Sequence, residues 1–132
     1  MLFRSIPGGF EAHGGRIRFT QDGFSLPVTA PGWDAPAPEG RFFLGVRPES
    51  LRLVPQSQAP VSGVVRLVEA RGPEVVLTVG VGAMNLKVVA PAARHPTEDE
   101  TVGLDADPAE LHVFDGRTSL RRDDLFLQGA TA

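Results

Sequence analysis

Hydrophobic and polar residues alternate along most of this chain, in short stretches separated by breaks. Ile17 and Phe19 alternate with polar neighbours, and Phe24, Leu26 and Val28 follow with the same spacing. A period of two residues is that of a half-buried β-strand. The pattern therefore predicts strands, and the 15 Gly and 12 Pro leave no room for long helices.

The breaks in this first part of the chain predict turns. Gln21-Asp22-Gly23 is a hairpin signal between the two alternating sets. Pro27 cannot donate a hydrogen bond to a neighbouring strand, so we expect its strand at the edge of a sheet. Residues 30–40 are rich in Pro, Gly and Ala and form either a loop or a short linker.

A three-strand meander is the clearest element of the sequence. Its strands are Val61–Glu69, Glu74–Gly80 and Met84–Val88. Arg71-Gly72-Pro73 turns the chain between the first two, with Gly72 supplying a φ that other residues avoid. The Gly80-Val81-Gly82 segment begins like a dinucleotide-binding loop, but it opens no helix, and we interpret it as a hairpin turn.

The last third of the chain carries one helix signal between two extended segments. Asp107-Pro108-Ala109-Glu110 has a capping Asp, Pro at the first helical position and Glu behind it, with space for one helical turn. Leu111 and Val113 then face the core, and Asp115 caps a turn by accepting from nearby amides or from Thr118. A final run, Leu125-Phe126-Leu127, is either a last strand or a tail that docks.

Eight to ten short strands of this kind indicate an all-β barrel or sandwich. The 132 residues suffice for one domain, or for two very small barrels that share an interface.

Cysteine is absent, which excludes disulfides and thiolate metal sites. The net charge of −3 gives no general attraction to nucleic acid. No apolar run reaches the ~18 residues of a membrane span, and no secretory signal is evident, so we expect a cytoplasmic protein.

Enzymatic signatures are missing from the sequence. There is no G-x-x-x-x-G-K-S/T phosphate loop and no G-x-S-x-G nucleophile elbow. His13, His95 and His112 lack metal-ligand spacing, and the acidic residues 98–100 are interpreted as a solvated loop. We therefore expect no catalytic, cofactor or metal residue in this chain.

Nucleic-acid binding is also weakly supported. Stacking platforms need exposed aromatic residues beside Lys or Arg. Arg16 and Arg18 share one strand face, but a single such pair is more often a solvated face, and Trp33 stands alone in a Pro-rich loop.

Two short motifs remain, and each has a structural interpretation. Pro48 holds Arg47-Pro48-Glu49 extended at the end of a strand, with a local ion pair. Leu111–Asp115 is a strand end and turn. We expect Arg47 and Glu49 to hold a barrel junction, and Gly72 and Asp115 to set turn geometry.

The order of these motifs resembles the C-terminal tail of the ATP-binding subunits of sugar-type ABC importers, the maltose and glycerol-phosphate group. That tail is the transport-associated OB (TOBE) domain. The matching residues are Gly45, Arg47, Pro48, Glu49, Glu69, Gly72, Asp107, Pro108, His112, Phe114 and Asp115. Residues 3–10 are similar to the junction at which the family's ATPase domain ends, although Gly8-Gly9 stands where Met-Asn is expected.

The resemblance implies an OB-like β-barrel with regulatory and dimerisation roles. Residues 1–10 would be the junction, 11–122 the domain, with a split into two small sub-barrels near 30–60, and 123–132 a tail. The implied partners are a second copy of the domain, an ATPase domain in cis and the permease subunits, at the inner face of the membrane. The chain itself would not hydrolyse ATP, because ATP and Mg²⁺ would be bound by the ATPase domain.

A small-ligand barrel is the alternative that stays open. An oxyanion or a sugar would be held by backbone amides and by Ser, Thr or Lys at a barrel junction, and Ser62, Thr78 and Lys87 are the candidates. The sequence does not identify a transported solute or the contact residues of a regulator.

Overall fold

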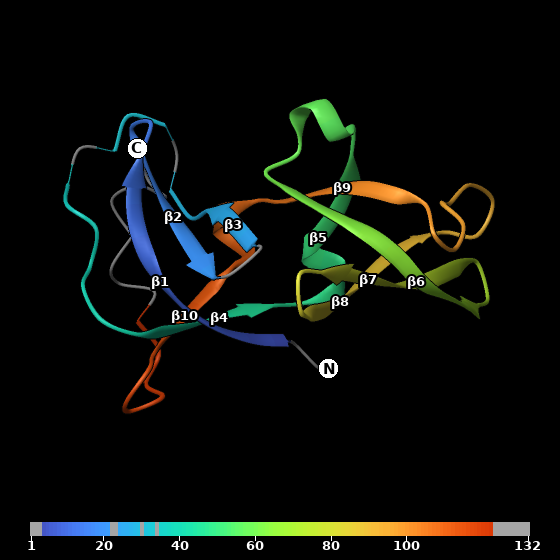
Figure 1. Ribbon diagram of the computed structural model, residues 1–132. Coiled ribbons are helices and arrows are strands. Elements are labelled where there is room, and N and C mark those ends of the chain that lie inside the picture. Colours follow the sequence, from blue (N-terminus) through green and yellow to red (C-terminus); the bar gives the residue numbers. More distant parts are fainter. Residues whose placement is uncertain (1–3, 22–23, 30, 34, 123–132) are drawn as a thin grey trace.

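The computed structural model describes residues 4–21, 24–29, 31–33 and 35–122, and within them the fold is all-β (Figure 1). Ten strands are present in this part of the chain, in agreement with the sequence pattern. They are β1 (Arg4–His13), β2 (Arg16–Gln21), β3 (Phe24–Pro27), β4 (Phe42–Val46), β5 (Leu51–Val54), β6 (Val61–Arg71), β7 (Glu74–Val81), β8 (Met84–Pro91), β9 (Thr101–Ala106) and β10 (His112–Asp115).

The first antiparallel sheet has the strand order β10-β4-β1-β2-β3. Its central strand, β1, pairs with β4 through residues 4–8 and with β2 through residues 9–13. β3 lies at the edge, as Pro27 predicts. The turn expected at Asp22-Gly23 lies outside the described residues, but the strands on either side of it pair as a hairpin does, with Gln21 opposite Phe24.

The second antiparallel sheet has the order β5-β9-β6-β7-β8 and contains the expected three-strand meander, β6-β7-β8. Its two outer strands, β5 and β8, also lie against each other, so the sheet curls into a small barrel. The turns at Gly72 and Gly82 have φ values of +63° and +58°, the left-handed region that glycine adopts without steric cost. Figure 1 shows this sheet beside the first one.

The chain passes between the two sheets twice, each time through a single turn of 3₁₀-helix. The first turn, η1 (Pro48–Ser50), joins β4 to β5, and the second, η3 (Pro108–Glu110), joins β9 to β10. A third such turn, η2 (Gln56–Gln58), connects β5 to β6, which both belong to the second sheet. The helical turn expected at Asp107–Glu110 is present as η3, and η1 and η2 are two further 3₁₀ turns that the sequence pattern did not indicate.

Alternate residues of the strands form the core. Fully buried side chains come from both sheets, including Ile6, Phe19 and Leu44 in the first and Leu77 and Leu104 in the second. The buried residues form one connected cluster, against which Trp33 and Ala37 of the 30–40 segment also pack. This segment is thus a loop folded onto the core.

Residues 4–10 are part of the folded sheet. β1 continues without a break past residue 10, and Ile6 and Phe10 are buried in the core. A Cβ atom at Gly8 would lie 2.8 Å from the Phe19 ring and against the Thr20 carbonyl oxygen. This close approach leaves no space for a side chain at position 8.

Candidate functional site

The first family motif lies at the crossing from the first sheet to the second. Gly45 is buried near the end of β4, and Arg47 has the extended backbone that precedes a proline, with φ −91° and ψ 151°. Pro48 and Glu49 then enter η1, which the Ser50 amide closes by donating to the Arg47 carbonyl at 3.0 Å. The expectation that the whole motif is extended is therefore wrong beyond Arg47.

The charged groups of this motif do not form the expected ion pair. Arg47 and Glu49 are exposed, and within the described part of the chain neither side chain has a hydrogen bond or an ion pair. The junction is formed by the backbone turn and by burial of Ser50, which is 6% exposed.

The second motif lies at the return crossing. Asp107 caps η3 by accepting from the Ala109 amide at 3.0 Å, and Pro108 occupies the first helical position as the sequence predicts. Leu111 and Val113 are buried, also as predicted. His112 accepts a hydrogen bond at Nδ1 from the Arg121 guanidinium.

The two motifs meet in the β4–β10 ladder. His112 lies opposite Gly45, and Phe114 lies opposite Phe43. At the end of this ladder, Asp115 Oδ1 accepts from the amides of Thr118 at 3.0 Å and Arg117 at 2.8 Å. These hydrogen bonds lower the pKa of Asp115 from its ordinary value of 3.8, and the bond from the Thr118 amide has the largest effect.

Glu69 and Gly72, the remaining motif residues, lie apart from this junction, on the β6–β7 hairpin. Glu69 Oε1 lies 3.5 Å from Lys87 Nζ, which also donates to Thr78 Oγ1 at 2.7 Å. Thr78 and Lys87 are thus together and bonded to each other, whereas Ser62 lies opposite Gly103 on another strand pair. The structure does not assemble the three candidate oxyanion residues.

Metal and membrane sites receive no support from the described residues. No group of three His, Asp or Glu side chains is placed to hold a metal ion within residues 4–21, 24–29, 31–33 and 35–122. Glu100 accepts from the Thr97 amide at 3.1 Å, which makes the acidic 98–100 segment part of a loop. In the same part of the chain no helix has the length and apolar character to cross a bilayer.

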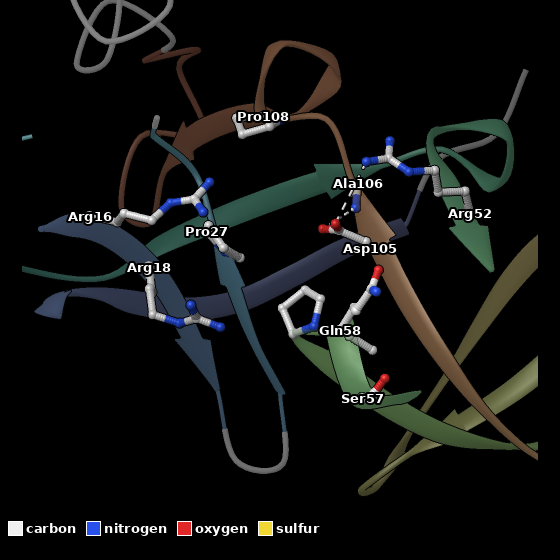
Figure 2. A pocket seen from close by; sticks show the side chains of 11 residues that line it. Arg16, Arg18, Pro27, Arg52, Ser57, Gln58, Asp105, Ala106 and Pro108 are labelled. Carbon is white, nitrogen blue, oxygen red and sulfur yellow. Dashed lines mark hydrogen bonds and ion pairs between the residues drawn. The ribbon is translucent and has the colours of Figure 1, made fainter. Parts of the chain in front are cut away.

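A polar pocket between the two sheets is the feature that sequence analysis missed (Figure 2). Its volume is about 560 Å³, within the range of about 300–1,000 Å³ of small-molecule sites. One wall comes from β2 and β3, and the other from β5, η2 and β9. The lining residues are Arg16, Arg18, Pro27, Arg52, Ser57, Gln58, Ala59, Pro60, Asp105, Ala106 and Pro108.

The arginines of this pocket are held in different ways. Arg16 Nε donates to the Thr29 carbonyl at 3.0 Å, and Arg18 Nε donates to Ser25 Oγ at 2.7 Å. Arg52 lies opposite Asp105 in the β5–β9 ladder, with Nη2 and Oδ2 3.6 Å apart. Neither Arg16 nor Arg18 has a carboxylate partner within the described residues.

The sequence indicated one wall of this pocket but not the other. The alternation in β2 puts Arg16 and Arg18 on the face opposite the buried Ile17 and Phe19, which correctly indicates a shared face. Nothing local to the sequence indicates that Arg52 lies across the opening from them, because it belongs to the other sheet.

The chain belongs to the TOBE domain family, whose profile matches residues 44–114. The matched segment runs from β4 to β10 and includes both crossings between the sheets.

Two relatives show how far the similarity extends. The sulfoquinovosyl glycerol transport ATP-binding protein SmoE of Agrobacterium fabrum (strain C58 / ATCC 33970) is 30% identical over 111 residues, which are 82% of this chain but 30% of SmoE. The match thus covers about 30% of the length of that relative.

The cytoplasmic molybdate-binding protein ModG, solved with molybdate bound, is similar in structure. The TM-score is 0.64 over 83% of this chain and 94% of the ModG chain, at 10% sequence identity. This likeness confirms the OB-like, all-β fold.

Proposed function

We propose that this chain is the TOBE domain of the ATP-binding subunit of a sugar-type ABC importer, in which it has a regulatory and dimerisation role. The observation that carries the proposal is the 30% identity to SmoE over 111 residues, together with the TOBE profile match. The same assignment puts the domain at the cytoplasmic face of the membrane, with an ATPase domain in cis and permease subunits as partners.

The domain would act on ATP turnover indirectly. Its 132 residues contain no phosphate loop, so we expect no ATP hydrolysis by the chain alone. Pairing of two such domains would keep two ATPase domains close while these separate and rejoin, because one retained interface raises the effective concentration of the other. A role of this kind requires a stable surface and no catalytic residue.

A domain exchange tests the proposal. The SmoE segment that aligns with this chain would be replaced by residues 4–122, and ATP hydrolysis and permease association would be measured in the assembled transporter. We expect the chimera to retain both, and a SmoE variant truncated before this segment to lose association or regulation. A chimera that behaves like the truncated variant would contradict the proposal.

Sedimentation velocity of the isolated chain over a wide concentration range tests the dimerisation part separately. A concentration-dependent shift towards the dimer is expected, and a strict monomer at the highest concentration would contradict self-association.

The alternative, in which the chain is a ligand-binding barrel using Ser62, Thr78 and Lys87, is not favoured. Lys87 is already bonded to Thr78 and paired with Glu69, and Ser62 lies on a different strand pair. The likeness to ModG rests on the fold at 10% identity, and so it does not extend to molybdate binding by this chain.

A further inference from the structure

We infer that the pocket between the two sheets binds a small phosphorylated sugar or polyol, with Arg16 and Arg18 as the phosphate-binding groups. This inference goes beyond the proposed function, and it can be tested whether or not the chain belongs to an importer. The argument rests on the charge, the orientation and the lining of the pocket.

The pocket is positively charged in a chain whose net charge is −3. Three arginines and one aspartate line it, and the aspartate is already compensated. Asp105 Oδ1 accepts from the Ala106 amide at 2.8 Å, and its Oδ2 faces Arg52. Glu11 lies opposite Arg18 in the β1–β2 ladder but forms no ion pair with it among the described residues. The positive charge of Arg16 is therefore left for a ligand, and that of Arg18 is offset only in part.

These two guanidinium groups are oriented before any ligand arrives. Arg18 donates to Ser25 through both Nε, at 2.7 Å, and Nη2, at 3.2 Å, and Arg16 is held by the Thr29 carbonyl. Each arginine has further N–H groups, and Figure 2 shows both side chains extending from β2 towards Pro27 of β3. The two arginines are two residues apart on one strand, about 7 Å along the backbone, and are held by Ser25 and Thr29, which are four residues apart in the chain. Each guanidinium group would therefore donate to a bound phosphate from its own side.

The remaining lining indicates what else the ligand carries. Ser57 and Gln58 are exposed on η2, at the opposite wall, where they can donate to and accept from hydroxyl groups. Among the described residues that line the pocket, three prolines supply apolar surface and none is aromatic. A stacked nucleobase is therefore disfavoured, and a hydroxylated phosphate monoester fits better.

The position of the pocket gives such binding a structural consequence. A ligand held by Arg18 on one side and Gln58 on the other would connect the two sheets, and so it would stabilise their relative arrangement. If the proposed function also holds, the ligand would act as an effector of the transporter, a consequence that rests on that function whereas binding does not.

Titration calorimetry on the full chain tests the inference, with glucose 6-phosphate as the probe and glucose, inorganic phosphate and citrate as comparisons. We expect one site for glucose 6-phosphate, weaker binding of phosphate and citrate, no binding of glucose, and weaker binding at high salt. Absence of binding at low salt would overturn the inference. Citrate or inorganic phosphate binding as tightly as glucose 6-phosphate would overturn the assigned ligand class.

Variants locate the site. Arg18→Gln should weaken binding about tenfold or more, because it removes a charge-assisted pair of donors. Gln58→Glu changes an exposed residue without removing a contact of the core, and the added carboxylate should weaken binding similarly. The matched control is Arg94→Gln, an exposed arginine outside the pocket, which should leave binding unchanged. Binding that survives both pocket variants, or that falls equally in the control, would overturn the location.

Discussion

Gly45 and His112 lie directly opposite each other in the β4–β10 ladder, although each belongs to a different sequence motif. The whole second sheet, from Leu51 to Ala106, is inserted in the chain between these two neighbouring strands. The motifs therefore mark the two ends of one insertion. Their residues identify the family because they shape the crossings, and no reaction chemistry is needed to explain them.

The packing of β1 against β2 predicts different effects for two adjacent glycines. Gly8→Ala should destabilise the fold by about 2 kcal/mol or more, since the new methyl group would overlap the Phe19 ring and the Thr20 carbonyl. Gly9→Ala is the matched control, because its Cβ would lie 3.5 Å from the nearest atom and should cost less than about 1 kcal/mol. Urea unfolding measures both, and equal losses in the two variants would contradict the interpretation.

The Asp115 turn predicts a pH-dependent contribution to stability. Because folding lowers the pKa of this carboxyl from 3.8, its charge stabilises the fold above that pH, and the contribution is lost as pH falls through the folded-state pKa. Asp115→Asn should thus lower Tm at neutral pH, and the difference from the parent chain should shrink in acid. The control, Glu49→Gln, changes an exposed carboxyl without a partner in the described residues and should show no such trend. A difference that is constant with pH would contradict a role for the charge.

The connected core predicts that the two sheets unfold together. Leu77→Ala removes a fully buried side chain from the second sheet and should cost about 2–5 kcal/mol. Trp33, the single tryptophan, packs on the core beside the first sheet. Its fluorescence therefore reports the unfolding of that region and not of the surroundings of Leu77. We expect the fluorescence and far-UV circular dichroism transitions to shift together. A Trp33 transition that stays in place while the dichroism signal shifts would show independent units.

The ion pair on the outer face of the second sheet predicts a small effect. Lys87 and Glu69 have side chains 48% and 52% exposed, so solvent screens their attraction. Lys87→Gln should change the free energy of unfolding by less than about 1 kcal/mol, and should leave glucose 6-phosphate binding unchanged. Loss of binding in this variant would move the anion site from the pocket to the β7–β8 face.

Much of the fold could be predicted because its signals are local. Alternation identified β2, β3 and the meander β6-β7-β8, Pro27 identified an edge strand, and Gly72 and Asp115 identified their turns. The errors also have local causes. Pro48 is compatible with both an extended segment and a 3₁₀ turn, and only the packing of the crossing selects the turn after Arg47.

The sequence by itself determined the all-β class, the phase of the alternating strands and the family, because these depend on residues close together in the chain or on the order of motifs. Only the tertiary structure decided that β4 and β10 are neighbours, and that Arg16 and Arg18 share a pocket with Arg52. The physical reason is that both relations join segments far apart in the chain: the whole second sheet lies between β4 and β10, and β3, the 30–40 loop and β4 lie between Arg18 and Arg52. Their proximity follows from how the buried faces of both sheets pack into one core, and no local spacing encodes it.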